Sequence, residues 1–158
     1  PQPLVLDADG INALAGHMDE WERRRGRVTV LTPHEGEFLR VGGDLSQGRT
    51  AAATEFAHQS GAVVVLKGPG TVVAGPDGRG RVNTTGNCGM AKGGSGDVLS
   101  GVVLALLGLG MDAFDACCCA VWLHGRAGDL AAQEKGQWGM TPTDLLERLP
   151  QALREVTE

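Results

Sequence analysis

Short apolar runs alternate along the chain with longer segments of helical periodicity. Three runs, at residues 4–6, 28–31 and 63–66, lack the polar alternation of a strand with one wet side, so we expect strands covered on both faces. Helical patterns cover residues 35–41, 49–59, 96–107, 113–133 and 143–156, and Pro150 is expected to kink or restart the last of them. This alternation predicts an α/β fold with a mainly parallel sheet and helices on both faces.

An antiparallel pair of strands is expected next to the parallel ones. Residues 71–74 and 81–83 flank Gly75-Pro76-Asp77-Gly78, whose residue types are typical of a turn between antiparallel strands. The first predicted strand begins within the first six residues, although a parallel sheet needs neighbouring strands and crossover helices. We therefore expect that the N-terminal part of the domain is missing from this chain.

Composition limits the classes of partner. The 158 residues, 42% hydrophobic and 21% charged, predict one folded domain over residues 1–158. A net charge of −5 without a basic stripe argues against nucleic acid as a partner. The sequence shows no signal peptide and no apolar stretch of bilayer length, so we expect no membrane association. Four cysteines, three of them consecutive, indicate small buried side chains rather than disulfides, which fits a cytoplasmic location.

The most informative segment is Gly93-Gly94-Ser95-Gly96-Asp97, which precedes an apolar run of helical length. Glycines let the backbone approach a ligand, and the first turn of a helix presents unpaired N–H groups, so the segment predicts an anion site, above all for phosphate. Asp97 is the candidate base, because a carboxylate at the mouth of the pocket can take a proton from a hydroxyl during phosphoryl transfer. The alternative is that Asp97 is an N-capping residue.

Each predicted buried strand ends in a polar or glycine-rich cluster. The clusters cover residues 7–12, 32–37 and 67–71. In open α/β sheets, ligands bind beyond the carboxyl ends of the parallel strands, and those ends lie at one edge. We therefore expect the three clusters and the glycine-rich segment to form a single site.

Several of these residues have a structural alternative. Lys67 offers a compact positive charge to a phosphate, or it is a solvated residue in a turn. His34 supplies a donor and an acceptor near neutral pH, or it belongs to a helix start. Asp7 and Asp9 are either carboxylate ligands for hydrated Mg²⁺ or caps of the following turn. The residues alone leave these alternatives open.

A second polar motif, His124-Gly125-Arg126-Ala127-Gly128-Asp129, lies within a long helical pattern. Its small residues suggest tight helix packing. For His124 and Asp129, roles in the core or on the surface are favoured over a role in the site.

Taken together, four ordered motifs resemble those of the ADP-dependent NAD(P)H-hydrate dehydratases, which belong to the ribokinase-like superfamily. The resemblance runs from Leu4 to about Arg154 and implies a three-layer fold. The motifs are centred on Asp7-Ala8-Asp9, Thr32-Pro33-His34-Glu35, Lys67-Gly68-Pro69-Gly70-Thr71 and Gly93-Gly94-Ser95-Gly96-Asp97.

The resemblance implies a repair reaction on hydrated NADH and NADPH. ADP, as co-substrate with Mg²⁺, phosphorylates the added hydroxyl, and loss of phosphate restores the nicotinamide ring, so that NAD(P)H, AMP and phosphate are the products. His34 would contact the hydrated dinucleotide, and Asp97 would contact it and act as the base. The adenine nucleotide would be bound by Lys67, Gly68, Pro69, Gly70, Thr71 and Gly96. No metal ligand is identified.

The resemblance also implies a homo-oligomer and functional coupling to an NAD(P)H-hydrate epimerase. Two alternatives remain open at this point. One is a kinase for a small molecule, such as a vitamin precursor or a sugar, and the other is a catalytically inactive nucleotide-binding remnant.

Overall fold

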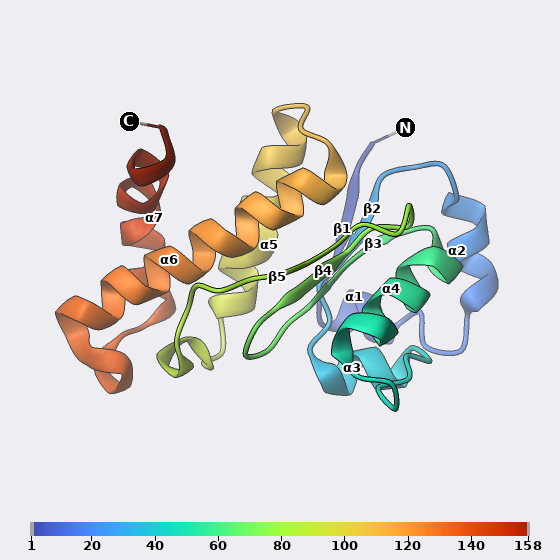
Figure 1. Cartoon of the computed structure of the whole chain (residues 1–158), viewed down its shortest axis with the longest axis horizontal. Helices are drawn as coiled ribbons and strands as arrows, with labels where there is room; N and C mark the ends of the chain where they lie inside the picture. The colour runs from blue at the N-terminus through green and yellow to red at the C-terminus, as the bar shows by residue number, and fades with distance from the viewer. Residues whose placement is uncertain (1, 158) are drawn as a thin grey trace.

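The computed structural model describes residues 2–157, apart from the side chains of residues 18, 19 and 22. Five strands form one sheet in the order β1-β2-β3-β4-β5 (Figure 1). The first two pairings along the chain, β1 with β2 and β2 with β3, are parallel as predicted, whereas β3–β4 and β4–β5 are antiparallel, so the sheet is mixed. The strands are β1 (Leu4–Leu6), β2 (Thr29–Leu31), β3 (Val63–Leu66), β4 (Val72–Ala74) and β5 (Gly80–Val82).

The five predicted helices are present, together with others that the periodicity did not indicate. They are α1 (Asp9–Asn12), α2 (Met18–Arg24), α3 (Glu35–Arg40), α4 (Arg49–Ser60), the 3₁₀ helix η1 (Cys88–Met90), α5 (Ser95–Gly108), α6 (Ala113–Gly139) and α7 (Pro142–Thr157). Helix α6 continues past residue 133, and its one non-helical residue is Gly136, with φ 72°. Helix α7 includes Pro150 without a restart, so that part of the prediction is wrong.

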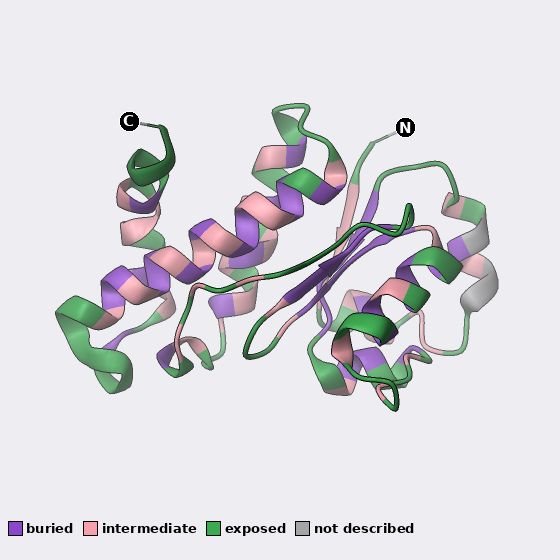
Figure 2. Ribbon diagram, in the orientation of Figure 1, coloured by how far each residue is buried: buried purple, intermediate pink, exposed green. Residues whose placement is uncertain are grey.

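Alternate residues of the strands pack on opposite faces of the sheet. Val30, Val65 and Val73 join a buried cluster with α5 and α6. Their neighbours Leu31 and Leu66 join a second cluster on the other face, with residues of α1 to α4. The purple buried residues in Figure 2 lie between these layers. A side-chain period of two places successive residues on opposite faces, so one apolar run supplies both cores. The structure therefore has the three layers of the predicted fold class.

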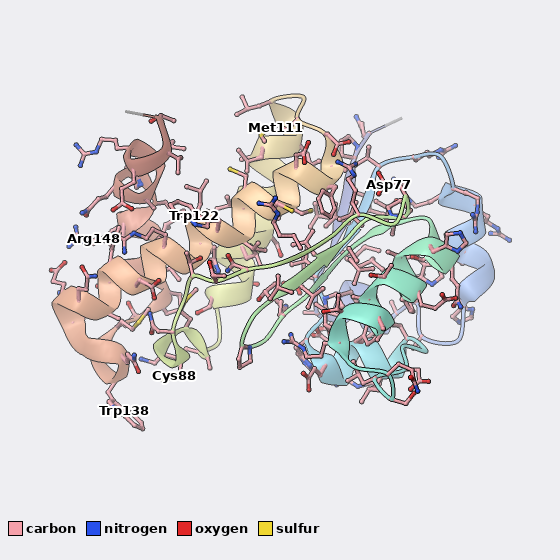
Figure 3. The ribbon with its side chains drawn as sticks, in the orientation of Figure 1. Asp77, Cys88, Met111, Trp122, Trp138 and Arg148 are labelled. Carbon is pink, nitrogen blue, oxygen red and sulfur yellow. The ribbon has the colours of Figure 1, made fainter. Side chains whose placement is uncertain are left out.

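Helix α7 packs along α6 and completes the layer. Leu145 and Ala152 of α7 are fully buried in a cluster with Leu123 and Ala127 of α6. Trp138, at the far end of α6, points into solvent and is 97% exposed (Figure 3). Among the described residues, no helix has both the length and the apolar character needed to cross a bilayer.

Candidate functional site

A cavity of about 860 Å³ lies at the edge where β1, β2 and β3 end. Ligand pockets in proteins commonly enclose roughly 300–1,000 Å³, so the cavity is large enough for a nucleotide. The start of α5 and the middle of α6 close its other side. All the site residues expected from the sequence line it, namely His34, Lys67, Gly68, Pro69, Gly70, Thr71, Gly96 and Asp97. The structure thus brings these residues together, as the strand-end argument predicted.

Lys67 is held in the cavity by an ion pair with Asp7. The Lys67 Nζ lies 2.7 Å from Asp7 Oδ1, and the Ser100 hydroxyl donates to Asp7 Oδ2 at 3.1 Å. Burial alone would raise the pKa of Asp7, but the hydrogen bond and charge of Lys67, with hydrogen bonds from Thr32 and Ser100, outweigh it and the pKa is lowered. Asp7 is therefore the partner of Lys67 and not a cap of the following turn, whose N-cap residue Ala8 has no side-chain cap, and its role as a ligand of hydrated Mg²⁺ stays a prediction.

Gly96 brings the glycine-rich segment against this ion pair. A Cβ atom at Gly96 would lie 3.3 Å from Asp7 Oδ2 and 3.4 Å from Lys67 Nζ. Both distances are at the lower end of normal packing, so a side chain here would fill the space in front of the lysine. The absence of a side chain leaves that space open to a ligand.

The first turn of α5 presents free amides to the cavity. Gly94, with φ 96°, is the N-cap residue and supplies no side-chain cap. Among the described residues, no acceptor bonds the amides of Gly96 and Asp97. Such amides, together with the helix dipole, favour an anion. Asp97 is the third residue of the helix, so the interpretation of it as an N-cap is wrong; its exposed side chain lines the cavity.

The loop after β3 is shaped by Arg49, which the sequence analysis did not identify. Two of its glycines have positive φ angles, 151° at Gly68 and 62° at Gly70. The Arg49 guanidinium donates to the carbonyls of Leu66, Pro69 and Gly70. Arginine in the first turn of a helix opposes the helix dipole, so its position at the start of α4 was the available signal.

His34 both caps α3 and lines the cavity. Its Nδ1 accepts from the amides of Gly36 at 2.9 Å and Glu37 at 3.3 Å, and Glu37 in turn accepts from the His34 amide at 2.8 Å. The structural alternative for His34 is thus confirmed. Its ring remains about half exposed and faces the same cavity as Lys67, so the cap does not prevent contact with a ligand.

The opposite wall consists of residues 83–88 and the polar motif of α6. His124 Nε2 lies 2.9 Å from the Ser95 carbonyl oxygen. Asp129 accepts from the Gly86 amide and from the Asn87 side chain, both at 2.9 Å. His124 lines the cavity, so the role favoured for it is wrong, whereas Asp129 does not line the cavity and has a structural role, tying the loop at 86–87 to α6. The polar run of Asn, Thr and Gly at 83–87 was a signal that the sequence analysis passed over.

Burial disfavours the charged form of the His124 imidazole in this wall. Burial lowers the pKa of His124 to about 4; the hydrogen bond with Ser95 works in the opposite direction, and the positive charge of Lys67 adds to the lowering. His124 is consequently neutral near pH 7, whereas Lys67, which lies against Gly96, places a positive charge beside the start of α5.

The described residues include no group of three or more histidine, cysteine or acidic side chains that would hold a metal ion. Asp7 is already bonded to Lys67 and Ser100. Asp97 is a cavity carboxylate with no hydrogen-bond partner in the described part of the chain. Mg²⁺ is commonly held by one or two carboxylates together with phosphates and water, so this donor set fits an ion carried by a nucleotide.

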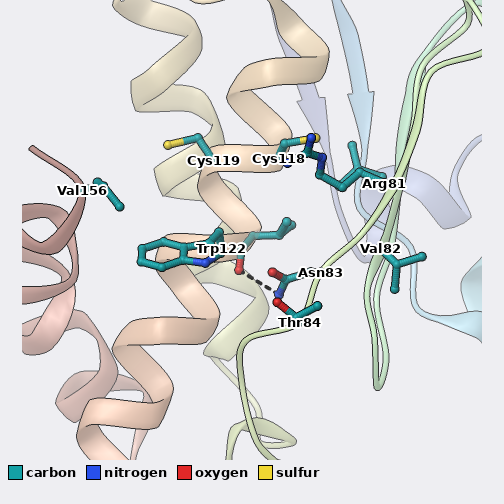
Figure 4. Close-up of a pocket in the computed structure, with 10 residues that line it drawn as sticks. Arg81, Val82, Asn83, Thr84, Cys118, Cys119, Trp122 and Val156 are labelled. Carbon is teal, nitrogen blue, oxygen red and sulfur yellow. Dashed lines mark hydrogen bonds between the residues drawn. The ribbon is translucent and has the colours of Figure 1, made fainter.

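A second hollow, of about 580 Å³, lies between β5, α6 and α7 (Figure 4). Arg81, Cys118, Trp122 and Val156 line it, and the Asn83 side chain bonds the Val121 carbonyl at its edge. Burial raises the pKa of the Cys118 thiol. None of the residues expected to bind ligand lies here, so the candidate site is the first cavity.

Comparison with known proteins gives a consistent set of relatives. A family model described as NAD(P)H-hydrate dehydratase matches residues 1–151. The bifunctional NAD(P)H-hydrate repair enzyme of Thermofilum pendens is 47% identical over 161 residues, covering 99% of this chain and 30% of that protein. The ADP-dependent (S)-NAD(P)H-hydrate dehydratase of Neisseria meningitidis is 42% identical over 140 residues, covering 85% of this chain and 47% of that protein.

Solved structures share the fold. The ADP/ATP-dependent NAD(P)H-hydrate dehydratase of Bacillus subtilis, co-crystallized with ATP/Mg²⁺, superposes with a TM-score of 0.83 and 38% identity, over 97% of this chain and 55% of that chain. A ribokinase-like superfamily protein of Enterococcus faecalis gives a TM-score of 0.80 with 27% identity, over 98% and 53% of the two chains. These similarities confirm the predicted ribokinase-like fold. The chain spans 30% to 55% of the length of these four relatives.

Proposed function

The chain belongs to the NAD(P)H-hydrate dehydratase family, and on that premise we propose that its cavity binds ADP and hydrated NADH or NADPH and converts the hydrate back to NAD(P)H. The observation that carries this proposal is the convergence of three features on one cavity. Lys67 with its glycine-rich loop, the free amides at the start of α5 and the Asp97 carboxylate all line it. This is the combination that transfer of a phosphoryl group to a hydroxyl requires.

The nucleotide is assigned to the lysine side of the cavity. Lys67 supplies the positive charge, and the backbone of residues 68–71 supplies N–H groups for the phosphates. The amides of Gly96 and Asp97 then lie where charge develops on the transferred group, and fixed donors at such a position stabilise the transition state. Mg²⁺ bound to the phosphates would neutralise part of their charge.

Asp97 is assigned as the base and His34 as a contact of the hydrated dinucleotide. The hydroxyl of the hydrated ring attacks the terminal phosphorus of ADP, and Asp97 accepts its proton as the new O–P bond forms. The bond from phosphorus to the bridging oxygen breaks, and AMP leaves. A carboxylate is a weak base toward a free alcohol, so proton transfer has to accompany attack on phosphorus rather than precede it.

Loss of phosphate completes the repair. The phosphate group leaves with the electron pair of the C–O bond, and the neighbouring ring carbon releases a proton, which restores the ring double bond. Phosphate is a far better leaving group than hydroxide, so a kinase-like site accomplishes a net dehydration. Dependence on Mg²⁺, assembly into a homo-oligomer and coupling to an epimerase remain predictions.

The experiment adds hydrated NADH, ADP and Mg²⁺ to the folded chain and follows the absorbance of reduced nicotinamide. The expected result is recovery of absorbance together with stoichiometric AMP and phosphate. Asp97→Asn is expected to lower the rate by about 10²–10⁴-fold, the usual contribution of a general base, while ADP affinity changes little. ADP binding without recovery of absorbance in the wild type would favour a nucleotide-binding remnant. Phosphorylation of an unrelated alcohol, with hydrated NADH unreactive, would favour a small-molecule kinase.

A further inference from the structure

The geometry points to His124 as a positioning residue of this site, which fixes the first turn of α5 by donating its Nε2–H to the Ser95 carbonyl. The inference deepens the proposed function and rests on it only in taking the bound anion to be a nucleotide phosphate. His124 is assigned no proton transfer. It orients the amides of Gly96 and Asp97, which are assigned to contact the ligand.

The direction of the hydrogen bond follows from chemistry. A carbonyl oxygen only accepts, so the His124 Nε2, 2.9 Å away, carries the hydrogen. The neutral ring then has its lone pair on Nδ1. Protonation would place the added hydrogen on Nδ1 and a second positive charge beside Lys67, whose charge already disfavours this. Asp7, an acid of the same cavity, is already paired with Lys67.

The first turn of α5 needs such a contact. Gly94 is the N-cap residue, in the αL conformation, and supplies no side-chain hydrogen bond to the turn. Within the described part of the chain, the bond from His124 is the one side-chain hydrogen bond that reaches residues 94–97. Ser95 is only 7% exposed, so its carbonyl has little access to water. As the first residue of α5, Ser95 also accepts the helical hydrogen bond at its carbonyl, so the loss of His124 removes the second bond to this oxygen, the one that ties the turn to α6.

Helix α6 holds the imidazole at a fixed height. Gly125, the next residue, touches Thr85 so closely that a Cβ at Gly125 would lie 2.2 Å from the Thr85 hydroxyl. The same hydroxyl donates to the Trp122 carbonyl at 3.0 Å. These contacts fix the backbone of α6 at Trp122 and Gly125, on either side of His124. The imidazole therefore connects α6 to the start of α5 from a fixed position.

Two substitutions distinguish a role of His124 as a hydrogen-bond donor from a role in filling space. In His124→Gln, the side-chain amide has the reach to donate to the Ser95 carbonyl, whereas His124→Leu fills the space without a donor. We expect the Leu variant to bind ADP with Mg²⁺ about tenfold more weakly and the Gln variant to stay within about threefold of the wild type, as measured by calorimetry. His58→Leu, at an exposed position on α4, is the matched control and should leave affinity unchanged. Equal affinities of the Leu and Gln variants would overturn the assignment.

A second measurement does not depend on turnover or on ADP binding. Nitrogen-15 NMR of the unliganded wild type should show the Nε2–H tautomer of a neutral ring at pH 6. The amide resonances of Gly96 and Asp97 should shift in His124→Leu and remain near their wild-type positions in His124→Gln. An Nδ1–H tautomer or a charged ring would contradict the inference, even for a protein that binds ADP well.

If the wild type fails to bind ADP, the proposed function fails, and the tautomer and amide shifts still decide the role of His124. Should the Leu variant not fold, His124→Asn, whose amide is too short to reach Ser95, takes its place.

Discussion

At the scale of single residues, the ion pair with Asp7 fixes the position of Lys67, the residue that we propose for phosphate binding. The pair lies partly inside the protein, with 16% of the Asp7 side chain and 22% of the Lys67 side chain exposed. Asp77 and Arg79 form an ion pair of the same length, 2.7 Å, at exposures of 50% and 43%. Solvent screens the second pair and much less the first, so equal lengths do not mean equal energies.

This contrast gives a prediction. Asp7→Asn should lower the free energy of unfolding by about 1–3 kcal/mol, because the substitution leaves a partly buried lysine without its counter-charge. Asp77→Asn, the control, should cause a much smaller loss. Urea unfolding of both variants at neutral pH measures the difference. Equal losses would mean that burial adds nothing to the Asp7–Lys67 pair.

His124 makes a prediction about pH. Its pKa is about 4 in the folded protein, against 6.5 for the free group, so between these two pH values the unfolded chain binds a proton that the folded chain does not. The contribution of His124 to the free energy of unfolding is therefore constant above pH 6.5 and is lost as the pH falls from 6.5 toward 4. Between pH 7 and pH 5 the wild type should lose about 1–2 kcal/mol more of its free energy of unfolding than His124→Gln. The other groups titrate in both proteins, so their effect cancels in the comparison.

The pH experiment compares urea unfolding of the two proteins at several pH values. Asp7 also loses its stabilising effect in acid, but its lowered pKa places that loss below its ordinary value of 3.8, outside the window of His124. Parallel stability curves for wild type and His124→Gln between pH 7 and pH 5 would show that the imidazole is not held neutral by burial.

At the scale of elements, α6 supports the site through residues without side chains. A Cβ at Gly125 would lie 2.7 Å and 2.8 Å from the Thr85 backbone, and a Cβ at Gly128 would lie 2.3 Å from the Met90 sulfur. These glycines let residues 85–90, which precede the glycine-rich segment at 93–97, pack directly on the helix. The motif at 124–129 thus forms the helix surface on which the cavity wall packs.

Gly125→Ala tests this contact. The methyl group collides with backbone that has to move, so we expect a loss of about 1–3 kcal/mol in the free energy of unfolding, and weaker ADP binding. Gly101→Ala is the control, since nothing lies within 4 Å of its Cβ and alanine favours a helix. The control should leave stability unchanged or slightly raised. A Gly125→Ala protein as stable as the control would show that the close approach is unimportant.

The elements were predictable where periodicity or strand composition was strong. The pattern indicated all five strands and the helices α3 to α7, because the buried strands are apolar runs, the antiparallel pair flanks a turn sequence and these helices show helical periodicity. It missed α1 and α2, which are short and carry too few apolar positions to show a period. It ended α6 at residue 133, since most residues after that position are polar. It also allowed a restart of the last helix at Pro150, whereas α7 continues through this residue.

At the scale of the whole molecule, the location of the site was predictable but the contacts within it were not. Parallel strands end at one edge, so polar clusters after three of them had to meet. The partners are a different matter: Asp7 and Lys67 are 60 residues apart and Asp129 and Gly86 are 43 apart, and no local pattern states which side chains pair. The positive φ of 47° at Ala8, which lines the cavity, is similarly invisible in the sequence.

The central claim is spatial: one cavity holds the terminal phosphate of ADP and the Asp97 carboxylate with room for one hydroxyl between them. A crystal structure of the chain with α,β-methylene-ADP and Mg²⁺ measures this directly. The account predicts the terminal phosphate against Lys67 and the amides of Gly96 and Asp97, with about 5–6 Å between phosphorus and carboxylate, which is the span of one hydrogen-bonded hydroxyl. A terminal phosphate bound away from Lys67, or one separated from Asp97 by packed side chains, would contradict it.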